Sequence, residues 1–383
     1  LNEYVSYLRD NDWNRTLSSA LSKTWTQHPD DSALNFGFTA DTVWVKVELE
    51  FEPVNRVSRY LVIPYPMLEE VEFAIVDGRG MPVYNSNVFH ARKQQNIASQ
   101  FVNFQLPDSL QGHYALVLKV KSTTSMQVPV EIWSESYLVS RQLREALWWG
   151  LYFGVLLALT AYNGFLYFSV RDPVYLYYGL YLTTTAGIML CLSGMGSLYL
   201  WPYDASINQR SLTLFTGMTS LFSTLFVRSF LDWKDFPETI KGVLAISALL
   251  CVALVVFAWF KPLLGAQLSG WVGSIAIGVA ILSGLYALSL GIVIARYFVL
   301  AFTMFAVGAS LYLLSVFGWL PVSNLTNYSI QAGSALEAVL LSLALAHRIK
   351  EDRVAVMRAL EQKHETLQKM KQMELESLEA ALH

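Results

Sequence analysis

Residues 148–170 read WWGLYFGVLLALTAYNGFLYFSV, and Arg171, Asp172 and Pro173 follow directly. The stretch carries no charge, and about 20 apolar residues of helix are enough to cross a hydrocarbon core of about 30 Å. Proline cannot continue a helix and two adjacent charges are costly in lipid, so the helix is expected to end at Arg171. The stretch therefore predicts a transmembrane helix, and it decides the class of the chain.

Six further apolar stretches follow. They begin near Val174 and then occupy residues 211–227, 242–260, 270–295, 297–317 and 327–346. Of the 383 residues, 54% are hydrophobic and only 15% are charged, against about 25% in ordinary globular chains. We therefore predict an integral membrane protein, with a seven-helix transmembrane bundle over residues 145–348 that is embedded in a lipid bilayer.

Short β-strands are expected before the bundle. Residues 43–51 place Val43, Val45 and Val47 on one face and Trp44 and Lys46 on the other, which is typical of a half-buried strand. Similar runs occupy residues 60–64, 71–76, 101–106, 114–121 and 128–133. Turn residues such as those at 77–80 separate them. Six or more such strands predict an all-β sandwich over residues 1–140.

The C-terminal segment has a different pattern. Residues 349–383 contain no Gly or Pro and are rich in Glu, Lys, Leu and Met, which favours an amphipathic helix that pairs as a parallel coiled coil. The spacing drifts around residues 371–374, as it does at a stutter. The helix has no stop signal at its end, so a segment downstream is expected. The predicted seam of the homodimer contains Leu360, Leu367, Leu378 and Leu382.

Loop charge predicts the orientation, because Lys and Arg are retained on the cytoplasmic side. With the N-terminus outside, the inner segments hold more basic residues than the outer ones, which have Arg210 and Lys261. Arg141 and Arg144 argue mildly for the reverse, but a translocated domain counts little in this rule. We expect the N-terminal domain in the periplasm and the C-terminus in the cytoplasm. The absence of an initiator Met fits removal of a signal peptide.

Several function classes are excluded by the composition. The net charge of −3 and the lack of a basic stripe argue against nucleic-acid binding. Both cysteines lie inside apolar runs and the histidines are scattered, so no metal site or cofactor is expected. The chain contains no motif of a cyclase, a kinase or a nucleotide-binding loop, so we expect no enzymatic activity from it.

Two groups of residues are candidates for binding a ligand. Trp44 and Lys46 share one strand face, where an exposed indole beside a cation could hold a sugar or an anion; alternatively, Trp44 covers one end of the sandwich core. Tyr65, His90 and Arg92 fall in irregular segments that could rim the same face, although ordinary surface positions look the same.

Glu337 is the one carboxylate deep within a predicted span. Such a residue is costly in lipid, so it should face the interior of the bundle, where it is either a switch contact or a structural partner of Asn163 or a tyrosine hydroxyl. Small residues on the same helix, Gly333 among them, would let a neighbouring helix approach closely.

The chain resembles a known family, the bacterial seven-transmembrane receptors with diverse intracellular signalling modules. The stretches that carry the resemblance are residues 35–38 with 43–47, residues 163–178, and residues 333–350, which read GSALEAVLLSLALAHRIK. Lys46 and His347 depart from the family pattern, which has Arg and Asp at these positions. The resemblance implies a jelly-roll-like periplasmic domain that is similar to carbohydrate-binding modules. It also implies a location in the bacterial inner membrane and an attached diguanylate cyclase or histidine kinase.

We therefore expect a signal-transducing receptor. A small molecule, such as a carbohydrate, or a protein would bind outside, and the seven helices would change the register of the dimeric coiled coil inside. Cyclic di-GMP or two-component signalling would be the output. The alternative is a transporter or channel with a soluble cap. Against it, the sequence has no internal repeat and no matched pair of broken helices.

Overall fold

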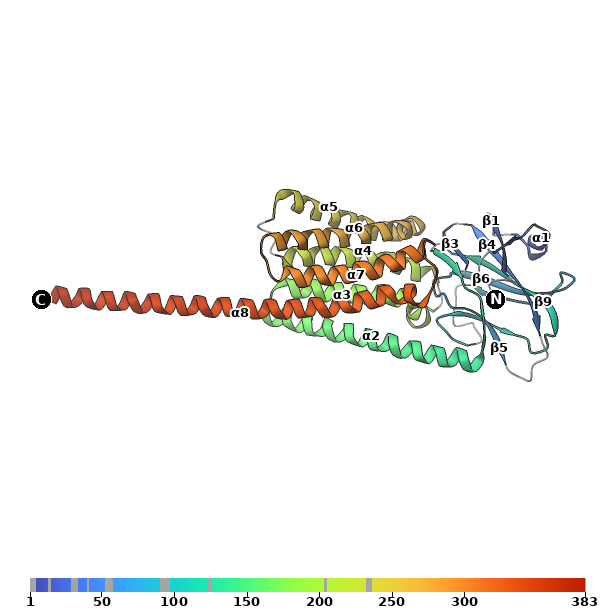
Figure 1. Ribbon diagram of the computed structural model, residues 1–383, viewed down its shortest axis with the longest axis horizontal. Coiled ribbons are helices and arrows are strands. Elements are labelled where there is room, and N and C mark those ends of the chain that lie inside the picture. The colour runs from blue at the N-terminus through green and yellow to red at the C-terminus, as the bar shows by residue number, and fades with distance from the viewer. Residues whose placement is uncertain are drawn as a thin grey trace.

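The computed structural model describes residues 5–12, 15–28, 34–39, 41–51, 58–89, 97–122, 125–202, 205–231 and 236–382. The described residues form an N-terminal β-domain and seven long helices. The β-domain lies at one end of the helix bundle, and the last helix projects far beyond the other end (Figure 1). The molecule is therefore elongated, with its β-domain and its free helix at opposite ends.

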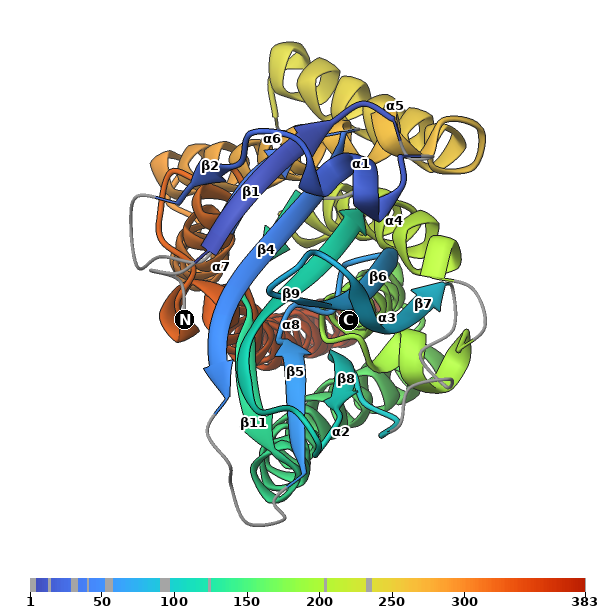
Figure 2. The ribbon, with the colours of Figure 1, turned by 90° about the vertical axis from the view of Figure 1, so that its right-hand side faces the viewer.

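The β-domain is a sandwich of one large and two small sheets, which Figure 2 shows end-on. The large sheet has the strand order β2-β1-β4-β9-β6-β7, the three-stranded sheet has the order β11-β5-β8, and β10 pairs with β3. The elements are β1 (Val5–Asp10), α1 (Leu17–Leu21), β2 (Thr26–Gln27), β3 (Leu34–Phe38), β4 (Thr42–Phe51), β5 (Arg59–Ile63), β6 (Glu70–Asp77), β7 (Pro82–Phe89), β8 (Val102–Leu106), β9 (Gly112–Lys121), β10 (Ser125–Val128) and β11 (Glu131–Ser134).

The apolar core lies between the sheets. Val43, Val45 and Val47 are completely buried, as their alternation predicts. Phe73 of the large sheet packs on Phe104 of the three-stranded sheet, with 4.9 Å between ring centroids. The predicted N-terminal β-sheet domain is confirmed, and two of its sheets enclose one core, whereas the jelly-roll connectivity stays a prediction.

The structure differs from the expected boundaries at two places. The run at 128–133 is two strands, because Pro129 has no N–H for the ladder and β10 ends just before it. The domain boundary expected at residue 140 lies inside a helix, because α2 already begins at Glu135. Ser134 ends β11 and caps α2 by accepting a hydrogen bond from the Tyr137 amide, so the sandwich continues directly into the first membrane helix.

The helices run back and forth along the bundle (Figure 1). Among the described residues, six of them are long and apolar enough to span a membrane, namely all but α4. They are α2 (Glu135–Val170), α3 (Pro173–Leu192), α4 (Ala205–Phe230), α5 (Glu238–Phe260), α6 (Pro262–Ser289), α7 (Ala295–Val316) and α8 (Asn324–Leu382), with a short π-helix η3 (Gly196–Leu200) after α3.

Helix α4 is less apolar than the other six because it carries many polar residues. Its buried polar side chains include Asn208, Thr213, Ser220 and Thr224. It packs against α3, α5 and α6, so these groups face protein and not lipid. The region predicted at 211–227 is thus a bundle helix, although its composition differs from that of the other six.

The turn between α6 and α7 lies earlier than expected. The predicted spans 270–295 and 297–317 were separated at Arg296, but α6 ends at Ser289 and Gly291 has a φ of 83°. Glycine adopts this left-handed conformation without steric cost, so it reverses the chain within an apolar segment.

Helix α8 is continuous over 59 residues, from the β-domain end of the bundle to well beyond the opposite end. Leu360 and Leu367 are exposed on its free part, while the side chains of Leu378 and Leu382 lie outside the described residues. The predicted helix over residues 349–382 is confirmed, and its pairing with a second copy stays a prediction.

Candidate functional site

Trp44 is buried, contrary to the exposed position that strand alternation predicts. Its side chain is 3% exposed, and it forms a second small core with Ala20, Val76 and Val117 beneath helix α1. The Lys119 ammonium lies 5.4 Å from the ring centroid of Trp44. Helix α1 covers this sheet face and removes the indole from solvent, so Trp44 belongs to this separate cluster and not to the core between the sheets.

Lys46 is held by neighbours on its own sheet face. It pairs with Glu48 at 2.8 Å and lies 5.4 Å from the ring centroid of Trp25. Trp25 packs against the same cluster as Trp44, but Trp44 is buried and the Lys46 ammonium is paired with Glu48, so the two residues do not form an exposed platform.

Tyr65 is at the boundary between the sandwich and the bundle rather than beside Trp44. It is 9% exposed, and its hydroxyl donates to the Ser125 carbonyl at 3.0 Å. Burial raises the pKa of the Tyr65 phenol, so the side chain stays neutral. His90 and Arg92 lie outside the described residues.

The sandwich caps the end of α7. The last carbonyls of any helix lack partners within that helix. Asn35 donates to the Ser315 carbonyl at 2.7 Å, and the Ser125 hydroxyl donates to the Val316 carbonyl at 2.9 Å. The rings of Phe38 and Phe317 lie 5.8 Å apart at the same place. These contacts fix the sandwich on the bundle through a helix terminus.

A cavity of about 160 Å³ opens beneath this contact. Its walls come from Tyr65, Phe38, Met67 and Ser125 of the sandwich and from helices α3, α4, α6, α7 and α8. The described lining residues include no charged side chain; they are mostly apolar, with hydroxyls from Thr216, Thr219, Ser220, Ser223 and Tyr312 among them. Such a cavity suits a small uncharged molecule with a few hydrogen-bonding groups.

Tyr181 connects the cavity to the helix that leaves the membrane. Its side chain lines the cavity, and its hydroxyl donates to Oε2 of Glu337 on α8 at 2.5 Å. Glu337 is 1% exposed, and its other oxygen, Oε1, has no hydrogen-bond partner within the described structure. Of the partners expected for Glu337, the structure provides the tyrosine hydroxyl.

Two more tyrosines hold the same face of α8. The Tyr152 hydroxyl lies 2.8 Å from the Ser334 hydroxyl, and Tyr178 donates to the Ala338 carbonyl at 2.7 Å. Asn163, the other expected partner of Glu337, instead donates to the carbonyl of Leu159 in its own helix at 2.8 Å. A row of hydroxyls from α2 and α3 thus positions α8 across about one helical turn.

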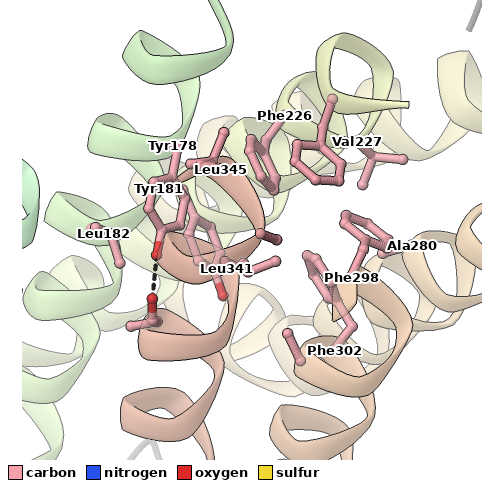
Figure 3. Packing of buried hydrophobic residues seen from close by; sticks show 14 of the residues in the cluster. Tyr178, Tyr181, Leu182, Phe226, Val227, Ala280, Phe298, Phe302, Leu341 and Leu345 are labelled. Atoms are coloured by element: carbon pink, nitrogen blue, oxygen red, sulfur yellow. Dashed lines mark hydrogen bonds between the residues drawn. The ribbon is translucent and has the colours of Figure 1, made fainter. Parts of the chain in front are cut away.

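Below this row, aromatic side chains fill the inner half of the bundle. Figure 3 shows Phe226, Phe298 and Phe302 gathered with Tyr178 around Leu341 and Leu345. The rings of Phe298 and Phe302 are 4.6 Å apart. Because close-packed side chains are hardly compressible, a displacement of one of these rings moves its neighbours as well.

Arg348 ties α8 to two other helices where it leaves the bundle. Its guanidinium donates to the Ser229 carbonyl at 3.2 Å, near the end of α4, and pairs with Asp172 at 3.4 Å, at the start of α3. Arg348 therefore contacts both the end of α4 and the start of α3. Its positive charge also complements the negative end of the α4 dipole.

Comparison with known families identifies the two parts. Residues 145–348 match the family described as 7TM diverse intracellular signalling, and residues 2–134 match the domain described as 7TMR-DISM extracellular 2. The chain belongs to the 7TM diverse intracellular signalling family. No curated protein matches the chain.

Membership in the 7TM diverse intracellular signalling family assigns the broad roles. The sandwich is an extracellular sensor domain, and the helices are the membrane-embedded part of a signalling receptor. Both matches are to sensor and membrane modules, and no catalytic domain is matched within the chain.

Some site residues could not be found from sequence reasoning. Arg348 lies inside a stretch that carries the family resemblance. Tyr181 lies just beyond another such stretch, and nothing in the sequence distinguishes it from the tyrosines around it. The carbonyls at the end of α7 carry no sequence signal at all, because every helix has them.

Proposed function

We propose that this receptor is controlled by a small, uncharged, largely apolar molecule that binds in the cavity between the sandwich and the bundle. The observation that carries the proposal is the position of Tyr181, which lines the cavity and also holds Glu337 on α8. An occupant that moves the Tyr181 ring changes the only hydrogen bond described for the Glu337 carboxylate. The same helix then carries that change into the cytoplasm.

The apolar walls of the cavity favour a different ligand from the carbohydrate that the family resemblance suggests. A carbohydrate needs many hydrogen bonds, whereas the cavity walls are mostly apolar with scattered hydroxyls. Ligands bury most of their surface in such pockets and use a few polar groups for orientation. A molecule with one or two hydroxyl or carbonyl groups therefore suits the cavity better than a sugar.

The remaining parts of the proposed mechanism follow from the family. The sensor domain would lie in the periplasm of a bacterium. Helix α4 would also cross the membrane, which brings the number of spans to seven. Residues 349–383 would pair with the same helix of a second copy. The paired helices would then drive a diguanylate cyclase or histidine kinase module of the full-length protein. The aromatic layer below the cavity supports a receptor over an open channel, because it fills the inner half of the bundle.

A thermal-shift screen of small uncharged molecules against the full chain in detergent tests the ligand site. Compounds that raise the melting temperature should lose their effect in Thr216→Phe, which fills the cavity with a ring. Leu249→Phe is the matched control, because Leu249 is exposed on the lipid side of α5. Binding that is equal in both variants would place the ligand elsewhere and refute the proposal.

A further inference from the structure

Helices α2 and α8 separate toward the β-domain, and a groove of about 840 Å³ lies between them. Figure 1 shows α2 diverging from α8 in that direction. The groove opens sideways, on the lipid-facing side of the bundle, and α2 is the least buried of the candidate spans. Its occupant must therefore come from the membrane or from another protein in it.

The outer mouth of the groove carries positive charge. Arg141 and Arg144 both line it, together with Glu145. Arg141 pairs with Glu145 at 3.2 Å, which leaves Arg144 as an exposed cation that has no hydrogen bond or ion pair within the described structure. The three residues together carry one net positive charge. An anion at the level of Arg144 would be the complementary partner.

The walls below the mouth are apolar and exposed. Trp148 is 69% exposed and Leu151 is 61% exposed on α2, and Val339 is 47% exposed on α8. Arg144 lies four residues before Trp148, so its guanidinium is about one helical turn above the indole. Tryptophan prefers the interface between headgroups and acyl chains, and a cation one turn outside it is at headgroup height.

We propose that this groove binds a phospholipid with an anionic headgroup from the outer leaflet. Its phosphate pairs with Arg144, and an acyl chain lies between the apolar walls of α2 and α8. The inner wall of the groove is the Tyr152 side chain, whose hydroxyl bonds Ser334 on α8. The lipid therefore packs against the same row of hydroxyls that positions the output helix, and it acts independently of the ligand cavity.

The shape of the groove favours a lipid over a helix of a second copy. The bulky side chains of Trp148 and Tyr328 at its walls would block the close approach that packing of a second helix requires. A flexible acyl chain can follow such walls.

Native mass spectrometry of the full chain in detergent tests the site, with phosphatidylglycerol and phosphatidylcholine of identical acyl chains as probes. The chain should retain phosphatidylglycerol preferentially. Arg144→Gln should reduce that retention about fivefold, since one basic residue near a membrane surface is worth about 1 kcal/mol. Lys261→Gln is the matched control, because Lys261 is also an exposed cation and lies away from the groove, at the turn between α5 and α6.

A second variant tests the groove itself. Ala335→Trp fills the groove between its walls and should lower the retention of both lipids, while circular dichroism confirms that the helices remain. Equal retention of the two lipids by the wild-type chain would overturn the proposal, as would an unchanged preference in Arg144→Gln. Conversion of a dimer to a monomer by Ala335→Trp, with lipid retention unchanged, would assign the groove to a second copy and equally overturn it.

Discussion

The hydrogen bond between Tyr181 and Glu337 is the contact through which the proposed cavity ligand would act on α8. A carboxylic group that is 1% exposed depends on its few partners, because water cannot replace them. Oε1 of Glu337 already lacks a partner within the described structure, so the tyrosine hydroxyl is the contact that fixes this side chain.

Removing that hydroxyl should destabilise the bundle. Tyr181→Phe should lower the free energy of unfolding by about 1–3 kcal/mol, because it leaves a buried polar group unsatisfied. Thermal unfolding of the full chain in detergent measures the effect. Tyr177→Phe is the control, since Tyr177 lies one turn away on α3 and is only partly buried. Glu337→Gln combined with Tyr181→Phe should cost less than the sum of the two single changes, and strict additivity would contradict the pairing.

Trp44 provides a second test at the scale of one residue. Trp44→Ala should lower the free energy of unfolding of the β-domain by about 3–5 kcal/mol, because it leaves a cavity beneath α1. Lys46→Ala should change it by less than about 1 kcal/mol, since its ion pair is half-exposed. Chemical denaturation followed by tryptophan fluorescence distinguishes the two. A loss below about 1 kcal/mol for Trp44→Ala would mean that α1 does not cover the indole.

The sequence was informative about single residues only where local rules apply. Glu337 stands out because a carboxylate inside an apolar run is costly wherever the fold places it. The surroundings of Trp44 could not be inferred, because α1 is a separate segment whose position over the sheet depends on tertiary packing. The cavity was equally inaccessible, since five helices and the sandwich meet to form it.

At the scale of elements, α7 and α8 pack most closely of all helix pairs. Ser329 donates to the Gly308 carbonyl at 2.9 Å, and the Met304 carbonyl would lie 3.0 Å from a Cβ atom on Gly333. The small residues predicted on this helix do allow close approach, and Ser334 in addition bonds Tyr152.

A larger side chain at Gly308 should therefore separate α7 from α8. Gly308→Leu should collide with the backbone of Ser329 and prevent a folded, monodisperse chain from being recovered. Gly278→Leu is the control, because a Cβ atom there meets open space. Gel filtration and the melting temperature in detergent report the difference. Recovery of a Gly308→Leu chain as stable as Gly278→Leu would contradict the close packing.

The free part of α8 carries an unburied apolar seam that a second helix would cover. Cys replacing Leu360 or Leu367 should cross-link two chains readily, because burial of each Leu is worth about 1.5–3 kcal/mol. Cys replacing Lys363 or Glu365 should cross-link poorly. Oxidative cross-linking in membranes separates the patterns. Equal yields at all four positions, or none, would rule out a paired helix with this seam.

Helix boundaries show what apolar runs can and cannot predict. The first span was evident from its composition, yet α2 begins 13 residues earlier at Glu135, where a polar helix joins the sandwich. Helix α4 packs against α3, α5 and α6 despite its polar composition, because burial within the bundle keeps its Asn, Ser and Thr side chains away from lipid. The composition of a helix therefore indicates whether it faces lipid, but it does not by itself indicate whether the helix belongs to the bundle.

At the scale of the molecule, helix α8 is held at three heights along the bundle. The outer end of α8 borders the cavity through Ile330, its middle is held by the tyrosine hydroxyls, and Arg348 fastens its exit from the bundle. A small movement at the cavity would therefore displace the whole of α8, because α8 is one continuous helix. Shifts of 1–2 Å are the usual scale for helices in such transitions.

Spin-label distances between position 168 on α2 and position 367 on α8 test this account most directly, with labelled chains diluted in lipid nanodiscs. Thr216→Phe, which occupies the cavity, should shift the mean distance by at least about 1–2 Å. The same change in a Tyr181→Phe background should produce no further shift, and Leu249→Phe should produce none. An unchanged distance in Thr216→Phe, or the same shift with and without the Tyr181 hydroxyl, would contradict a relay from the cavity through Tyr181 to α8.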